Sequence, residues 1–272
     1  MGRHRHLLLS LLSLGACRAP VAGAAEVVPV DPALRLHGHN DYLQPVPLRT
    51  ALELGLGSVE ADVFLVDGEL RVGHERWQLR PGRTLRALYL EPLREHAAAR
   101  GGRIRADGAP FVLLVDIKAD GTGVYRQLRQ ELAGYAALLT RFVDGRIEPG
   151  AITVVLSGDR PRDLVAADRD RLCSLDGRLG DLASNPPRDL VPWISDSWAR
   201  IGDWNGRDEL LPDERAKIVA LVAQAHAQGR ELRFWGAPDR PEGWQVLWDL
   251  GVDRIGTDQP KVAAAWLREH VR

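Results

Sequence analysis

Residues 36–75 read LHGHNDYLQPVPLRTALELGLGSVEADVFLVDGELRVGHE, and this stretch decides both the fold and the candidate site. Two histidines stand one residue apart near its start, two acids stand one residue apart in its middle, and a third histidine comes near its end. Each group lies at or near the end of an apolar run that predicts a β-strand. Imidazoles and carboxylates gathered at strand ends are the groups that a metal-assisted hydrolase needs. The residues concerned are His37, His39, Glu60, Asp62 and His74.

Outward from this stretch, short apolar runs alternate with helical patterns along the whole chain. The sequence predicts strands at 34–39, 58–66, 111–117, 152–156, 172–175, 191–194, 232–235 and 254–257. It predicts helices at 47–54, 84–100, 124–139, 161–167, 211–228, 241–250 and 260–271. About eight strand–helix alternations over roughly 240 residues predict an α/β fold, a single (β/α)8 TIM barrel. A doubly wound sheet would also alternate, but no glycine-rich phosphate loop follows the first strand.

Length and charge narrow the class of protein. The chain has 272 residues, a net charge of −1 and 45% hydrophobic residues, which is enough for a large core. Proteins that track a phosphate backbone need a basic excess or a basic stripe, so the charge balance argues against a nucleic-acid partner. Cys173 lies in the apolar context RLCSL, which predicts a buried cysteine and not a nucleophile.

The N-terminus has the pattern of an export signal. Residues 1–6 are basic, residues 7–16 are apolar and small, and a stretch rich in alanine, glycine and proline follows to residue 25. The residues LGAC at 14–17 resemble a bacterial lipobox, in which Cys17 would be lipidated and would attach the chain to a membrane; cleavage after Ala24 is the alternative. We therefore predict a signal peptide at 1–25 and one barrel domain at 26–272. The predicted location is outside a bacterial cell, either extracellular or as a cell-surface lipoprotein.

In a TIM barrel the active site lies at the C-terminal ends of the strands. Glu60 and Asp62 are two residues apart in a predicted strand, so both side chains point to the same face. Asp116 and Lys118 occupy the end of the next strand, in the motif VDIK. His74 follows a predicted hairpin with an Asp-Gly turn, which can bring it back over the barrel mouth.

Three carboxylates at neighbouring strand ends would repel one another and be driven toward protonation. A hard divalent cation relieves that repulsion, and an all-oxygen ligand set favours Mg²⁺ or Ca²⁺ over Zn²⁺. A structural network in which Lys118 and arginines pair with the acids is the alternative. Two histidines across the site could divide the work of general base and general acid. We predict that four residues bind the substrate and its phosphate: Lys118, Asn40, Trp235 and Asp258. His37 and Tyr42 are two further candidates at the pocket.

At this point the motifs resemble a known superfamily. The stretch GSVEADVFLVDGELRVGHE is similar to the glycerophosphodiester phosphodiesterase pattern of an E-x-D pair, a hairpin and a histidine. VDIK and DLGVDRIGTDQP resemble later segments of the same pattern, in the same order. HNDY, PLRTAL, SVEADV and RFWGAPD look most like the "altered inheritance of mitochondria" type proteins of the PLC-like phosphodiesterase superfamily.

The resemblance implies a PLC-like TIM barrel that cleaves a small phosphodiester or a phospholipid, with no protein partner. It implies His39 and His74 as the acid/base pair, and Glu60, Asp62 and Asp116 as ligands of one Mg²⁺ or Ca²⁺ ion. Two modes of attack remain open. The nucleophile is either water or a neighbouring hydroxyl of the substrate, and the second gives a cyclic phosphate. The sequence departs from the pattern at one place: the H-R-G opening with its arginine is absent, and HND stands there. This departure leaves the substrate unnamed.

Two other functions fit part of the pattern. His37 and His39 at the end of the first strand also suit a Zn²⁺-dependent amidohydrolase barrel with Asp258 as its acid. That class needs further histidines at the ends of the middle strands, and those runs offer none. A non-catalytic, exported barrel that binds a phosphate or a lipid is the third possibility, although it would not require both histidines and all three acids.

Overall fold

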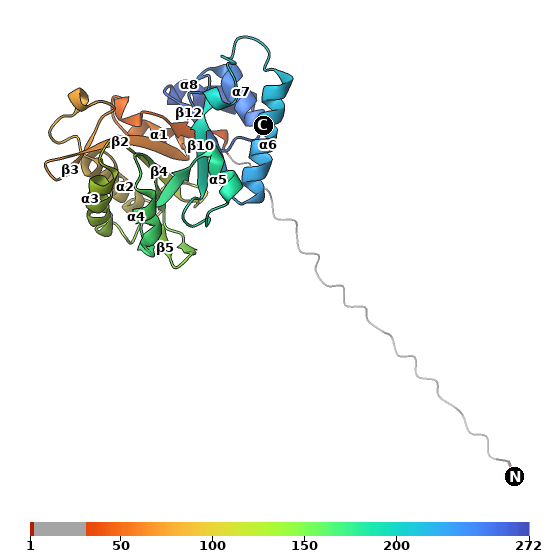
Figure 1. The fold of residues 1–272 in the computed structure, drawn as a ribbon. Coiled ribbons are helices and arrows are strands. Elements are labelled where there is room, and N and C mark those ends of the chain that lie inside the picture. The colour runs from red at the N-terminus through yellow and green to blue at the C-terminus, as the bar shows by residue number, and fades with distance from the viewer. Residues whose placement is uncertain (3–30, 272) are drawn as a thin grey trace. The chain divides into compact units, whose positions relative to one another are not determined.

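Eight parallel strands of the computed structural model surround one axis and form a nearly closed barrel (Figure 1). The structure describes residues 1–2 and 31–271. Around the barrel the strands follow the order β11-β10-β9-β7-β4-β2-β1-β12, and a single bridge between Arg233 and Arg254 joins the two ends. The eight strands are β1 (Leu36–Gly38), β2 (Ser58–Val66), β4 (Phe111–Ile117), β7 (Ile152–Gly158), β9 (Ser174–Gly177), β10 (Trp193–Ser197), β11 (Glu231–Trp235) and β12 (Ile255–Thr257).

Helices connect the strands, as the alternating pattern predicts for a (β/α)8 barrel. Four of them carry a proline in the first turn, where its missing N–H costs nothing. The helices are α1 (Arg49–Leu54), α2 (Glu91–Ala98), α3 (Gly121–Ala133), α4 (Arg162–Ala167), α5 (Leu179–Ser184), α6 (Pro212–Ala227), α7 (Pro241–Asp249) and α8 (Pro260–His270). The predicted TIM barrel is therefore confirmed.

Two predicted helices differ from the structure by more than the one or two residues found at the ends of the others. The run at 84–100 divides into a π-helical turn (Arg86–Leu90) and α2. Helix α3 begins earlier than predicted because the Asp120 carboxylate accepts the N–H of Gly123 at 3.1 Å and caps it. It ends at Ala133 because glycine follows, which is a poor helix former.

Four short antiparallel strands lie outside the barrel path. Strand β3 (Glu69–Val72) pairs with β2 through the predicted Asp67-Gly68 turn. A separate sheet of β5 (Arg141–Val143), β6 (Arg146–Glu148) and β8 (Asp170–Arg171) was not predicted. Its Asp144-Gly145 turn has positive φ at both residues, the geometry that suits a two-residue hairpin.

The two faces of each barrel strand differ in character. Outward-facing side chains such as Val59, Ala61 and Leu113 are fully buried in the main apolar core. Inside the barrel, Val112, Leu114, Val155 and Trp193 form a small apolar cluster of their own. Two residues beyond Leu114 on the same face comes Asp116, so the interior turns from apolar to charged toward the C-terminal mouth.

Within the described residues, no helix combines the length and the apolar character that crossing a membrane requires. The predicted signal peptide, including Cys17, falls almost wholly on residues 3–30 and so lies outside the described part of the chain.

Candidate active site

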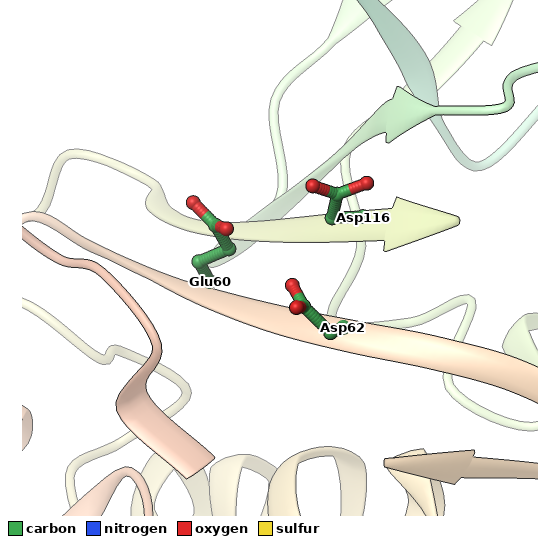
Figure 2. Close-up of side chains that lie close together, drawn as sticks. All are labelled: Glu60, Asp62 and Asp116. Carbon is green, nitrogen blue, oxygen red and sulfur yellow. The ribbon is translucent and has the colours of Figure 1, made fainter. Parts of the chain in front are cut away.

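Three carboxylates from two adjacent strands form the centre of the site. Glu60 and Asp62 come from β2 and Asp116 from β4, and strand register makes Asp62 and Asp116 direct neighbours. One oxygen of each residue lies within 4.8 Å of the others, and Figure 2 shows the three carboxylates close together, two from β2 and one from β4. The sequence predicted this cluster because strand spacing and strand order together bring the three residues to one place.

Asp62 is fully buried, and its two oxygens have very different surroundings. Oδ2 accepts hydrogen bonds from the Tyr42 hydroxyl at 2.8 Å, and it lies 2.7 Å from Lys118 Nζ and 2.8 Å from His74 Nδ1. Oδ1 has no hydrogen-bond partner among the described residues, although it is shielded from solvent. Buried polar atoms nearly always have a partner, so Oδ1 is suited to a ligand such as a cation.

Glu60 is held by an arginine that the sequence interpretation missed. Arg233, on β11, donates from Nη2 to Glu60 Oε2 at 2.8 Å, and both side chains are about 5% exposed or less. Burial by itself would raise the pKa of Glu60, but the charge of Arg233 and the hydrogen bond with His37 together outweigh it and hold that pKa well below the usual range. Arg233 stands between apolar residues in LRFW and shares the inward face with Trp235, and that alternation was the available signal.

The other two carboxyls are shifted in the opposite direction. Burial raises the pKa of Asp62, and the neighbouring charge of Glu60 raises it further. Burial also raises the pKa of Asp116 to about 6, in spite of the opposing charge of Lys118. The cluster thus shows the mutual repulsion expected of carboxylates that share one site.

Lys118 neutralises only part of the negative charge of the three carboxylates. Its Nζ lies 2.7 Å from Asp62 Oδ2 and 3.3 Å from Asp116 Oδ2. Together with Arg233 it supplies two positive charges against three carboxylates, which leaves one negative charge in surplus among these groups. A divalent cation would convert that surplus into one positive charge, the sign that a phosphodiester anion requires.

His37 lies beneath the carboxylates in the barrel interior. Its Nδ1 is 2.9 Å from Ser58 Oγ and its Nε2 is 3.2 Å from Glu60 Oε2. Complete burial lowers its pKa to about 3, so the ring is neutral at physiological pH. Because both ring nitrogens are already engaged, the geometry does not favour His37 as a Zn²⁺ ligand of an amidohydrolase site.

His39 occupies the mouth between the carboxylate cluster and β12. Its Nδ1 lies 2.8 Å from Asp258 Oδ1, which leaves Nε2, 3.8 Å from Glu60 Oε1, on the side of the cluster. Burial alone would lower the pKa of His39, but the hydrogen bond to Asp258 and the charge of Glu60 outweigh it and raise the pKa. A carboxylate that fixes one ring nitrogen leaves the other to exchange protons.

His74 reaches the same cluster at Asp62, whereas His39 lies beside Glu60, and the predicted hairpin brings it there. The Gly73 N–H donates to the Asp62 carbonyl at 3.1 Å, and the His74 N–H donates to Gln78 Oε1 at 2.7 Å. These bonds place the His74 ring with Nδ1 on Asp62 and with 53% of the side chain exposed.

The remaining predicted residues lie around the carboxylates and His39 at the mouth of the barrel. The Tyr42 hydroxyl contacts Asn40 Oδ1 at 2.6 Å in addition to Asp62, and Asn40 Nδ2 lies 3.3 Å from Asp258 Oδ1. Trp235 lines a cavity of about 100 Å³ together with His39 and Asp258. All of the predicted site residues are thus at one end of the barrel. Asp258 contacts His39 directly, so its geometry suits orienting that ring; its contact with the phosphate stays a prediction, which the repulsion between two anions disfavours.

Relatives of the chain match it over most of its length. The altered inheritance of mitochondria protein 6 homolog of Arthroderma benhamiae is 30% identical over 279 residues, which cover 92% of this chain and 87% of that protein. Altered inheritance of mitochondria protein 6 of Eremothecium gossypii is 29% identical and covers 89% of this chain and 71% of its own. Proteins of the same name from Saccharomyces cerevisiae are 25% identical.

These relatives correct the predicted location. They are proteins of yeasts and other fungi, which contradicts the prediction of a secreted or cell-surface bacterial lipoprotein. The prediction rested on a short basic and apolar N-terminus followed by one cysteine. Such a pattern has few specified positions and arises readily by chance.

The fold also matches a solved structure. The glycerophosphodiester phosphodiesterase from Agrobacterium tumefaciens superposes with a TM-score of 0.50 at 15% identity and covers 85% of this chain and 98% of its own. The AIM6-like phosphodiesterase domain matches residues 24–174, which carry the carboxylate cluster, Lys118 and both site histidines. The chain therefore belongs to the family of AIM6-like phosphodiesterases.

Proposed function

We propose that this chain is a metal-dependent phosphodiesterase in which Glu60, Asp62 and Asp116 hold one Mg²⁺ or Ca²⁺ ion. The observation that carries the proposal is the buried Asp62 Oδ1, which belongs to a cluster of three carboxylates and has no hydrogen-bond partner in the described part of the chain. Oxygen-only ligands are the set that hard divalent cations prefer. The bound cation would bind a phosphoryl oxygen and neutralise negative charge as it develops.

The side chains around the cluster then have separate tasks. His39 would accept a proton at Nε2 from the attacking water or substrate hydroxyl, because Asp258 fixes its Nδ1. His74 would donate a proton to the leaving oxygen. Lys118 and Tyr42 hold Asp62 Oδ2 and so fix the orientation of that carboxylate.

The substrate class follows from the charge and from the relatives. The three carboxylates, Lys118, Arg233 and a bound divalent cation would together carry one net positive charge, which suits a singly charged phosphodiester. The matching domain is named a phosphodiesterase and the structural neighbour a glycerophosphodiester phosphodiesterase. These names support a glycerophosphodiester or a phospholipid-like diester as the substrate.

Hydrolysis of bis-p-nitrophenyl phosphate tests this function. The purified chain should release p-nitrophenol in the presence of Mg²⁺ or Ca²⁺, and excess chelator should abolish the release. Restoring the cation should restore the rate. Hydrolysis that continues at full rate in chelator would refute the metal-dependent function, and absence of hydrolysis with every divalent cation and diester tried would favour a binding protein.

Replacing His74 with alanine should lower turnover of the diester by about 10²-fold or more while metal affinity stays near the wild-type value. The reason is that His74 contacts Asp62 only through Oδ2 and is not itself a ligand. Turnover and calorimetric metal binding measure the two effects separately. The matched control is His226→Ala. It removes a half-exposed histidine of α6 that pairs with Asp253. Unchanged turnover in His74→Ala would remove His74 from the mechanism.

A further inference from the structure

Arg178 stands at the barrel mouth directly after β9, and none of the roles above uses it. Its Nη1 donates to Asp176 Oδ2 at 2.8 Å and to the Gly177 carbonyl at 2.7 Å. Its Nη2 donates to Ser157 Oγ at 3.3 Å, and its guanidinium carbon lies 4.8 Å from the centre of the Trp235 ring. Residues of three strands, β7, β9 and β11, thus hold the guanidinium in place.

The two outer contacts locate the guanidinium relative to the site. Ser157 on β7 is the register partner of Asp116 on β4, so one side of Arg178 lies next to the strand of the carboxylate cluster. On its other side Arg178 contacts Trp235, which lines one cavity together with His39. Arg178 therefore lies at the same mouth as the carboxylates and His39.

Part of the guanidinium is free to bind a ligand. A guanidinium has five N–H donors, and Nε–H and one N–H of Nη2 have no partner within residues 31–271. The Arg178 side chain is 30% exposed, while its partner Asp176 is fully buried. Arg162 on α4 differs, because both of its terminal nitrogens are engaged by Asp181 at 2.6 and 3.2 Å.

A second guanidinium increases the positive potential there. Burial lowers the pKa of Arg160, and the charge of Arg178 lowers it further, which marks the two groups as close neighbours. Nε of Arg160 is buried and has no hydrogen-bond partner among the described residues. An anion beside Arg178 would reduce the repulsion between the two arginines.

We propose that Arg178 binds a non-bridging oxygen pair of the substrate phosphoryl group through Nε–H and Nη2–H. This inference rests on the proposed phosphodiesterase function and adds the group that recognises the phosphate. The planar fork of a guanidinium matches phosphate oxygens with two parallel hydrogen bonds, whereas an ammonium group offers only a point charge. The ring of Trp235 and the Asp176 carboxylate fix the fork in advance of binding.

Titration of the full chain with inorganic phosphate in the presence of Mg²⁺, followed by calorimetry, tests the inference. Arg178→Ala should weaken phosphate binding and raise KM for bis-p-nitrophenyl phosphate by about 10- to 100-fold, the range for lost charged hydrogen bonds. Arg178→Lys should lie between Arg178→Ala and the wild type. Arg162→Ala is the matched control and should bind phosphate as the wild type does. Mg²⁺ affinity should remain within about twofold in all variants, because none of them removes a ligand.

A second measurement uses the wild-type chain and does not depend on a variant that folds. Phosphate should protect Arg178 from modification by phenylglyoxal, as read by mass spectrometry, more strongly than it protects Arg162. Unprotected Arg178, or phosphate affinity in Arg178→Ala equal to the wild type, would overturn this inference alone when the wild type still hydrolyses the diester. A wild type that neither binds phosphate nor hydrolyses any diester would overturn both this inference and the proposed function.

Discussion

His39→Ala should reduce turnover of bis-p-nitrophenyl phosphate by about 10²- to 10⁴-fold, the usual cost of losing a general acid or base. The ring has the geometry of a base, with Nδ1 fixed by Asp258 and Nε2 facing the carboxylate cluster. Steady-state kinetics at saturating Mg²⁺ measures the effect. Metal binding should persist, because the three carboxylates are untouched.

Asp258→Asn provides a graded comparison for this prediction. The amide keeps the shape of the side chain but loses the charge that favours a proton on Nδ1 of His39. Its turnover should therefore fall between those of the wild type and His39→Ala. If His39→Ala turns over the diester at the wild-type rate, the catalytic assignment of His39 is wrong.

Arg233→Met should destabilise the fold by about 3–5 kcal/mol, because it leaves the buried Glu60 carboxylate without its cationic partner. The pair is 2.8 Å apart and almost completely shielded from solvent. Urea unfolding in the presence of chelator measures the free energy without any contribution from bound metal. The same pairing means that Glu60→Gln will disturb both the fold and metal binding, so Asp116 is the better position for testing the metal site.

Two further variants serve as a rescue and a control for the Arg233 prediction. The double variant Arg233→Met with Glu60→Leu should recover most of the lost stability, since apolar replacements for a buried ion pair are often tolerated. Arg200→Ala removes an exposed arginine 3.8 Å from Asp196 and should change stability by less than about 1 kcal/mol. A loss in Arg233→Met no larger than that of Arg200→Ala would show that the buried pair contributes little.

Local patterns were sufficient for most of the fold and for the carboxylate cluster. The spacing of Glu60 and Asp62 fixes their common face, and the neighbouring strands β2 and β4 bring Asp116 beside them. The Asp67-Gly68 turn brings His74 back to the same place. These relations involve either one strand or two strands that neighbour each other in the barrel, so periodicity and turn chemistry predict them.

Contacts across the barrel could not be predicted in the same way. Arg233 and Glu60 are 173 residues apart in sequence, and only closure of the barrel brings them together. Arg178 contacts Trp235 for the same reason. The small sheet of β5, β6 and β8 was missed because its strands have two or three residues, too few to show an alternating pattern. The prediction of the cellular location was wrong for a different reason: a short N-terminal motif carries little information.

Calorimetric titration of Mg²⁺ and Ca²⁺ into the wild type and Asp116→Asn tests the central claim most directly. The control is Asp67→Asn, which changes an exposed acid in the hairpin turn and fits its positive φ. We predict one divalent ion per wild-type chain, unchanged binding in Asp67→Asn, and affinity at least about tenfold weaker in Asp116→Asn. Equal binding in all three proteins, or no binding to the wild type, would contradict a metal site built from Glu60, Asp62 and Asp116.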